Sequence, residues 1–126
     1  MDFRIELVPL AVTDVDRAKA FYGETVGWNV DHDQTISSEL RFVQVTPPGS
    51  ACSICFGTGL QMMAEGSSQF VQAVVADADA ALADLQGRGV ECRGVDEQAW
   101  GRFVYFEDPD GNRWALQELP DHSRQS

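Results

Sequence analysis

Residues 8–18, VPLAVTDVDRA, and residues 71–81, VQAVVADADAA, are two versions of the same stretch. Each begins as an apolar run, passes through an Asp-rich turn and enters a segment with apolar residues at helical spacing. Asp14 in the first copy aligns with Asp77 in the second. Thr13 or Asp14 in the first copy, and Asp77 in the second, can cap the first amide groups of a helix. Such a repeat predicts a fold built from two copies of one supersecondary unit.

Three further strands are expected after the helix in each half. They fall at about residues 28–32, 40–46 and 51–57 in the first half, and 90–95, 103–107 and 113–118 in the second. The sequence Asp-Pro-Asp-Gly-Asn at residues 108–112 predicts a tight turn, because Pro fixes φ and Gly or Asn accepts positive φ. The pattern predicts an α+β fold made of two βαβββ repeats.

The length of 126 residues is typical of a single domain, so we expect one domain over residues 1–126. Within it, the first repeat is expected at about residues 4–57 and the second at about 70–119. Residues 58–69 are expected to link the two repeats, and residues 120–126 to form a polar, frayed tail.

The chain is strongly acidic, with a formal net charge of -11. Such a surface repels phosphate backbones, so we expect no nucleic-acid partner; the charge either maintains solubility or favours a cationic ligand. No apolar run is long enough to span a bilayer, and the first residues lack a basic region followed by an apolar stretch. The expected location is the cytoplasm, with no membrane partner.

Cysteine and histidine offer few metal ligands. Cys52 and Cys55 lie three apart on an expected strand and therefore point to opposite faces, which disfavours a shared metal or a disulfide. His122 lies in the polar tail. His32 lies between two aspartates, where a surface metal site remains an alternative.

The early motif Val-x-Asp-x-x-x-Ala-x-x-Phe-Tyr and the late motif Asp-Pro-Asp-Gly-Asn, within two βαβββ repeats, resemble the vicinal oxygen chelate superfamily. This family includes glyoxalases, extradiol dioxygenases and bleomycin-resistance proteins. The resemblance covers residues 4–119 and implies curled mixed sheets around a cup. The residues that carry it are Val12, Asp14, Ala18, Phe21, Tyr22, Gly27 and Asp108–Asn112.

In metal-dependent members of that family, four strand positions aim into the cup and supply His, Glu or similar ligands. In the family, two of these positions lie seven residues before the aspartate of each strand-to-helix turn, and two lie about four residues after the glycine of the turn before the last strand of each half. Counting from Asp14, Asp77, Gly49 and Gly111 places them at Leu7, Phe70, Ser53 and Ala115. Three of these side chains have no ligand atom, and a neutral serine is a poor ligand for a divalent ion. We therefore expect no metal and no other cofactor, although carboxylates elsewhere leave a displaced metal site as an alternative.

The same positions predict an apolar lining with a few polar groups, as in many small-molecule sites. Strand alternation adds Cys55 to the face of Ser53, and Gln117 to the face of Ala115. Aromatic residues near the last loops either stack on a flat ligand or close the barrel. The alternative is that apolar side chains fill the cup as core. The expected ligand-binding residues are Leu7, Ser53, Cys55, Phe70, Trp100, Phe103, Tyr105, Ala115 and Gln117.

Two functions compete on these grounds. The first is binding or sequestration of a small, cationic or aromatic compound, as the resemblance to bleomycin-resistance proteins implies. The second is an enzyme, either a glyoxalase-like lyase or isomerase or a dioxygenase, working without metal or with displaced ligands; no catalytic residue is identified. A third possibility is that the cup is only packed core and that the domain functions through its dimer surface. Because an open sheet edge invites association, we expect a homodimer.

Overall fold

The computed structural model describes residues 1–120, and these form two compact units. The first unit contains Met1–Gln69 and the turn Asp108–Gly111; the second contains Phe70–Glu107 and the chain from Asn112 onward. Each unit is a βαβββ module with a mixed four-stranded sheet, so the predicted α+β fold is confirmed. Residues 121–126, with His122 and most of the expected polar tail, lie outside the described residues.

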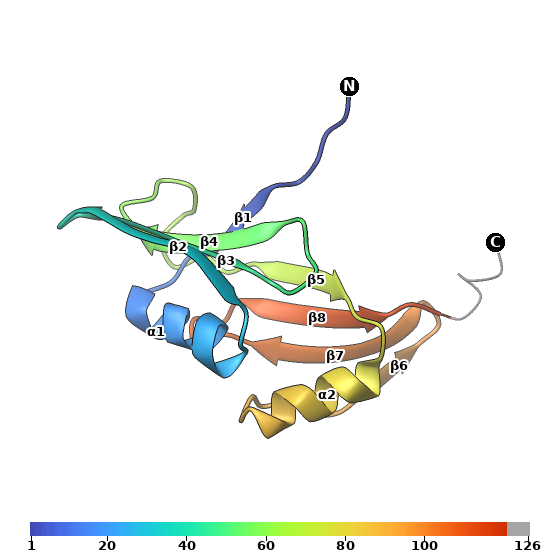
Figure 1. Ribbon diagram of the computed structural model, residues 1–126. Coiled ribbons are helices and arrows are strands. Elements are labelled where there is room, and N and C mark those ends of the chain that lie inside the picture. Colours follow the sequence, from blue (N-terminus) through green and yellow to red (C-terminus); the bar gives the residue numbers. More distant parts are fainter. Residues whose placement is uncertain (121–126) are drawn as a thin grey trace. The chain divides into compact units, whose positions relative to one another are not determined.

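The first unit has the strand order β1-β4-β3-β2. Strand β1 runs parallel to β4, and the other neighbours are antiparallel. A π-helical segment, η1, directly continues the helix α1, and both lie beside the sheet in Figure 1. The elements are β1 (Leu7–Pro9), α1 (Val15–Ala20), η1 (Phe21–Thr25), β2 (Asn29–Ser37), β3 (Leu40–Thr46) and β4 (Ser53–Thr58).

The second unit repeats this topology with the order β5-β8-β7-β6. Strand β5 is parallel to β8, while β7 pairs antiparallel with both β8 and β6. The elements are β5 (Phe70–Val74), α2 (Ala78–Gly87), β6 (Asp96–Gln98), β7 (Gly101–Glu107) and β8 (Arg113–Glu118). The two units thus share one sheet order, as the internal sequence repeat predicts.

Aspartate begins the helix in both units. The Asp14 carboxylate accepts a hydrogen bond from the backbone N–H of Arg17, and the Asp77 carboxylate accepts one from the N–H of Ala80. Both caps have extended backbone, with φ of -136° and -148°. Of the two candidates in the first half, Asp14 and not Thr13 is the cap, and the predicted capping role of Asp77 is confirmed.

We expect Asp77→Ala to lower the free energy of unfolding by about 1 kcal/mol, because the first turn of α2 loses its side-chain acceptor. Chemical denaturation followed by circular dichroism measures this change. Asp84→Ala, on the exposed side of the same helix, is the matched control and should cost less. Equal losses in the two variants would contradict the capping role.

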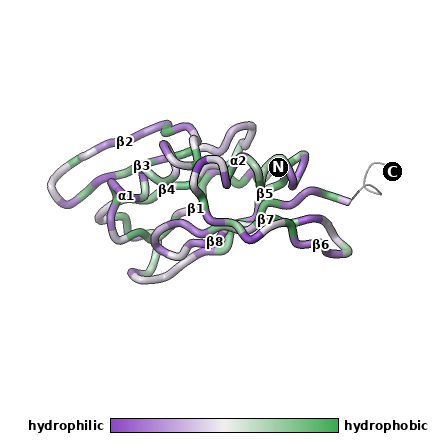
Figure 2. The backbone as a smooth tube through the Cα atoms, turned by 90° about the horizontal axis from the view of Figure 1, so that it is seen from below, coloured by the Kyte–Doolittle hydropathy of each residue, from purple (hydrophilic) through white to green (hydrophobic). Residues whose placement is uncertain are grey.

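Two predicted strands differ from the structure. The strand expected at residues 90–95 is absent, and β6 lies later, at Asp96–Gln98. The chain instead uses Val90 to end α2: its N–H donates to the Leu85 carbonyl after Gly89 turns with φ 83°. Strand β2 extends five residues beyond the expected end at residue 32, as a polar edge hairpin with β3. Figure 2 shows much of β2 in hydrophilic colours.

The face of each sheet that is turned toward its helix holds most of the apolar core, and Cys55, Phe103 and Ala115 are buried on the opposite faces. In the first unit the buried Tyr22 ring packs against Phe56, with centroids 5.8 Å apart. In the second unit Arg102 and Glu118 contact α2, which assigns alternate residues of β7 and β8 to the helix side. The core residues on the helix sides are Val43, Val45, Ile54 and Phe56 in the first sheet, and Val104, Phe106, Trp114 and Leu116 in the second.

The turn Asp108–Gly111 belongs to the first unit, where it contacts the helical segment. The Tyr22 hydroxyl donates to the Asp108 carboxylate at 2.7 Å, and both side chains are buried. Gly111 has φ 83° and donates its N–H to the Asp108 carbonyl, which confirms the predicted turn. None of the helices in the described part of the chain has the length and apolar character to span a bilayer.

Candidate functional site

The face of the second sheet that is turned away from α2 carries most of the predicted ligand-binding residues. We call this surface the open face of the second sheet. Register pairs Ala115 with Gln72 on one side and with Tyr105 on the other, and pairs Gln117 with Phe103. Residues paired in register share a face. The second unit thus brings together Phe70, Phe103, Tyr105, Ala115 and Gln117.

A chain of amide hydrogen bonds fixes the polar part of this face. The Gln72 amide donates to the Gln117 side-chain oxygen at 2.8 Å, and the Gln117 amide donates to the Trp100 carbonyl at 2.8 Å. Gln117 is buried, whereas Gln72 and Trp100 are exposed. The side chain of the buried Gln117 is therefore held in one orientation. Gln72 uses one side-chain N–H for this bond and keeps its second N–H and its oxygen for other partners.

Aromatic rings form the apolar part of the same face. Phe103 and Tyr105 stack with centroids 5.9 Å apart and planes 4° from parallel. Phe103 is buried, while 43% of Tyr105 is exposed. The Arg113 guanidinium lies 5.3 Å from the centroid of the half-exposed Phe70 ring. Exposed rings beside amide groups are suited to contact a flat organic molecule.

The Tyr105 hydroxyl is held as a neutral phenol. It donates to the Asp96 carboxylate of β6 at 3.2 Å. Desolvation and, after it, this hydrogen bond and the negative charge of Asp96 raise the pKa of Tyr105 above its ordinary value. At neutral pH Tyr105 is therefore protonated, so it can offer a ligand ring contacts and hydrogen bonds but cannot act as a base.

The open face of the first sheet, turned away from α1, carries the other predicted residues. Leu7 of β1 pairs in register with Ser53 of β4, and Pro9 pairs with Cys55. Ser53 and Cys55 are buried. Burial raises the pKa of the Cys55 thiol to about 11, so the thiol stays protonated and is a poor nucleophile.

On this face, hydrogen bonds link Ser53 through Thr46 to the carboxylate of Asp31, which was not among the predicted site residues. Thr46 donates a hydrogen bond to Asp31, and its hydroxyl lies 2.6 Å from the Ser53 hydroxyl. Because Thr46 has one proton to donate, Ser53 is the donor to Thr46. Hydrogen bonding, first from Thr46 and also from Asn29 and Gln44, lowers the pKa of Asp31 against the opposing effect of burial. Asp31 is therefore an anionic acceptor on this face.

We expect Thr46→Val to raise the pKa of Asp31 toward its ordinary value, since valine keeps the shape of threonine but removes the donor. A pH titration of the side-chain carboxyl carbon by NMR measures the shift. Ser53→Ala is the control, because it leaves the hydrogen bond from Thr46 to Asp31 in place. An unchanged Asp31 pKa in Thr46→Val would contradict the assignment.

The positions that would carry metal ligands do not fit a divalent ion. Leu7, Phe70 and Ala115 supply no donor atom, and the Ser53 hydroxyl is engaged with Thr46. Across residues 1–120, no three His, Cys, Asp or Glu side chains are grouped closely enough to hold a metal ion. Asp33, beside His32, instead forms ion pairs with Lys19 and Arg41.

On β5, the residue that lies beside Ala115 is not the one predicted by counting back from Asp77. Phe70 pairs with Arg113, and the residue beside Ala115 on β5 is Gln72. The cause is the strand-to-helix connection. The strand-end bonds are Leu10 N–H to the Cys55 carbonyl and Val75 N–H to the Gln117 carbonyl. Three residues lie between Leu10 and Asp14, but only one lies between Val75 and Asp77.

Counting back from the aspartate therefore ends two residues too early in the second repeat. Phe70 still lies on the expected face, because a two-residue shift preserves strand alternation. Gln72 is the functional candidate that the count missed. Its only sequence signal is an amide within an otherwise apolar strand.

Cys52, Cys55 and Cys92 are all free thiols.

A model of the Glyoxalase/Bleomycin resistance protein/Dioxygenase superfamily matches residues 4–116. The chain belongs to this superfamily. A curated relative, the uncharacterised protein YetH of Bacillus subtilis (strain 168), is 30% identical over 119 residues, which covers 91% of this chain and 98% of YetH. The superfamily match agrees with the resemblance carried by the two sequence motifs.

Solved structures of the superfamily fold are also similar. TnmS3, an antibiotic binding protein from Streptomyces sp. CB03234, is 35% identical with a TM-score of 0.81, covering 94% of this chain and 98% of TnmS3. A glyoxalase/bleomycin resistance protein from the same Streptomyces strain is 37% identical with a TM-score of 0.76, covering 90% of this chain and 99% of that one.

Proposed function

We propose that the protein binds a small organic molecule, of the kind used as antibiotics, on the open face of the second sheet. The observation that carries the proposal is the stacked Phe103–Tyr105 pair beside the fixed amides of Gln72 and Gln117. The similarity to TnmS3 supports it. The rings supply apolar contact, and the amides supply hydrogen bonds that orient the ligand.

Binding without turnover is favoured over a glyoxalase-like reaction by the chemistry of the predicted residues. At the superfamily metal positions, Leu7 and Ala115 carry no donor atom. The Ser53 hydroxyl and the Gln72 amide are neutral groups that already form hydrogen bonds, so no metal-assisted step is assigned to these positions. The Cys55 thiol and the Tyr105 phenol are both held in their protonated forms. Sequestration requires only affinity, which an apolar face with a few fixed polar groups provides.

A fluorescence titration of the chelator-treated protein with a panel of antibiotics from different chemical classes tests the proposal. Trp100 is 61% exposed next to Gln117 and serves as the reporter, while Trp100→Phe identifies its share of the signal. We expect at least one compound to bind with a Kd of about 10 µM or tighter. We also expect mass spectrometry to recover it unchanged after incubation. Catalytic consumption of the compound would favour the enzyme, and no binding across the panel would contradict the proposal.

We further propose that the protein forms a two-fold homodimer. Strands β1 and β5 are edges of their own sheets, and β1 is only three residues long. Unpaired strand edges favour association. Sedimentation velocity at micromolar concentration should give twice the 13.9 kDa mass of one chain. A mass equal to a single chain would contradict this prediction.

A further inference from the structure

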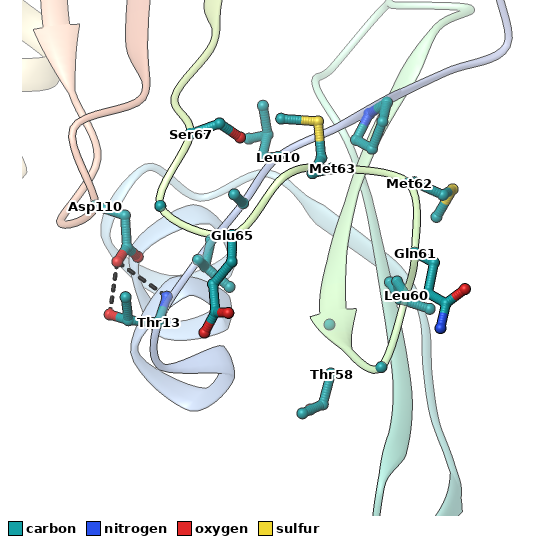
Figure 3. A pocket seen from close by; sticks show the side chains of 16 residues that line it. Leu10, Thr13, Thr58, Leu60, Gln61, Met62, Met63, Glu65, Ser67 and Asp110 are labelled. Atoms are coloured by element: carbon teal, nitrogen blue, oxygen red, sulfur yellow. Dashed lines mark hydrogen bonds between the residues drawn. The ribbon is translucent and has the colours of Figure 1, made fainter.

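A pocket of about 750 Å³ lies within the first unit. The segment between β1 and α1 forms one wall, and residues 57–67 form the other (Figure 3). A turn at Ala64–Ser67 and the Gln69 amide, which contacts Pro9 and Met63, hold the second wall. In Figure 3, Asp110, Thr13 and Glu65 lie on one side of the pocket, and Leu60, Gln61 and Met62 lie on the other.

Asp110 brings a partly unsatisfied carboxylate to this pocket. Its Oδ1 accepts three hydrogen bonds, from the backbone N–H and the hydroxyl of Thr13 and from the Arg17 guanidinium, at 3.0, 2.7 and 3.1 Å. Its Oδ2 is buried and has no hydrogen-bond partner within residues 1–120. Only 6% of the side chain is exposed. A buried carboxylate oxygen without a donor is costly, and a ligand that supplies one relieves that cost.

The rest of the pocket is suited to a short apolar body. Met62 and Met63 contribute flexible, polarizable thioethers, and Leu10 and Leu60 contribute branched apolar side chains. The exposed Glu65 adds a second carboxylate. An anionic ligand would therefore meet two like charges, whereas a cation would be attracted by both.

We propose that this pocket is a second small-molecule site, which takes an organic ammonium or amidinium cation with a short apolar body. On binding, the Asp110 side chain turns to expose Oδ2, which accepts a hydrogen bond from the cationic N–H group. The apolar body lies against Met62, Met63 and Leu60. The net charge of -11 adds a long-range attraction for such a cation. This site does not depend on the proposed function of the open faces.

Hexylammonium chloride is the probe for this site, and NMR of methyl-labelled methionine is the readout. The chain has three methionines: Met62 and Met63 line the pocket, and Met1 is fully exposed at the N-terminus. We expect saturable shifts of the Met62 and Met63 methyl signals and none of the Met1 signal. Hexanol, the neutral analogue, should bind at least tenfold more weakly because it lacks the charge.

Asp110→Asn is the decisive variant, because asparagine retains the oxygen that accepts from Thr13 and replaces Oδ2 with an N–H donor. We expect it to weaken hexylammonium binding at least tenfold. Asp84→Asn is the matched control: it makes the same charge change on α2, and its affinity should equal that of the wild type. Should Asp110→Asn not fold, Glu65→Gln on the exposed linker should still weaken hexylammonium binding.

Four results would overturn the proposal. Unchanged hexylammonium affinity in a folded Asp110→Asn variant would show that the Asp110 carboxylate does not bind the cation. Hexanol binding as tightly as hexylammonium would show that charge is not recognised. Equal weakening by Asp84→Asn would assign binding to the general acidity of the surface. Shifts that do not saturate below about 10 mM, or that include Met1 equally, would leave no specific site.

Discussion

Trp114→Ala is expected to lower the free energy of unfolding by about 3–5 kcal/mol, because it empties the largest buried position of the second unit. Trp114 is 2% exposed on the helix side of β8 and stacks on Phe106 with centroids 6.0 Å apart. A loss of this size is a large part of the about 5–15 kcal/mol that stabilises a typical domain. Equilibrium denaturation monitored by circular dichroism measures it.

Trp114→Phe is the matched control for this prediction. It retains a ring against Phe106 and leaves a smaller cavity, so its loss should be clearly smaller than that of the alanine variant. A loss below about 1 kcal/mol for Trp114→Ala would show that the helix side of the second sheet is not its core.

Tyr105→Ala is expected to weaken binding of the panel compound about thirtyfold, equivalent to about 2 kcal/mol, while costing much less stability than Trp114→Ala. The two residues lie on neighbouring strands but on opposite faces of one sheet. Tyr105 is 43% exposed, so its removal leaves little cavity but deletes a ring from the open face. Fluorescence titration gives the Kd, and denaturation gives the stability.

Tyr105→Phe separates the ring from the hydroxyl. It keeps the stack on Phe103 and loses only the hydrogen bond to Asp96, so it should bind close to the wild type if the ring makes the contact. Unchanged affinity in Tyr105→Ala would place the ligand elsewhere. Loss of affinity in Tyr105→Phe equal to that in Tyr105→Ala would assign the contact to the hydroxyl.

The fold was predictable from sequence where a local signal and the internal repeat agreed. Asp77 begins its helix as expected, and Asp14 is one of the two caps expected for the first helix, because an aspartate before an apolar helical stripe has a direct capping role. The strand was predicted too early because Val90 is a residue type that favours strands. In the structure Gly89 has positive φ, and the N–H of Val90 donates to the Leu85 carbonyl at the end of α2.

The sequence was enough to predict which residues share a face of the sheet, but not which hydrogen bonds join them. Strand alternation correctly placed Ala115 and Gln117 on one side of β8. The register between β5 and β8 depends on a two-residue difference in loop length, so Gln72 could not be found by counting. Asp31 was missed because its hydrogen bond from Thr46 joins two strands across a β-bulge, which no local pattern reveals.

The crystal structure of the protein with its tightest-binding panel compound tests the central claim most directly. The predicted result is ligand density on the open face of the second sheet, within about 4 Å of Tyr105 and Gln117, with no metal ion between ligand and protein. Density confined to another surface, or a metal ion bridging the ligand to Ser53 or its neighbours, would contradict binding by rings and amides alone.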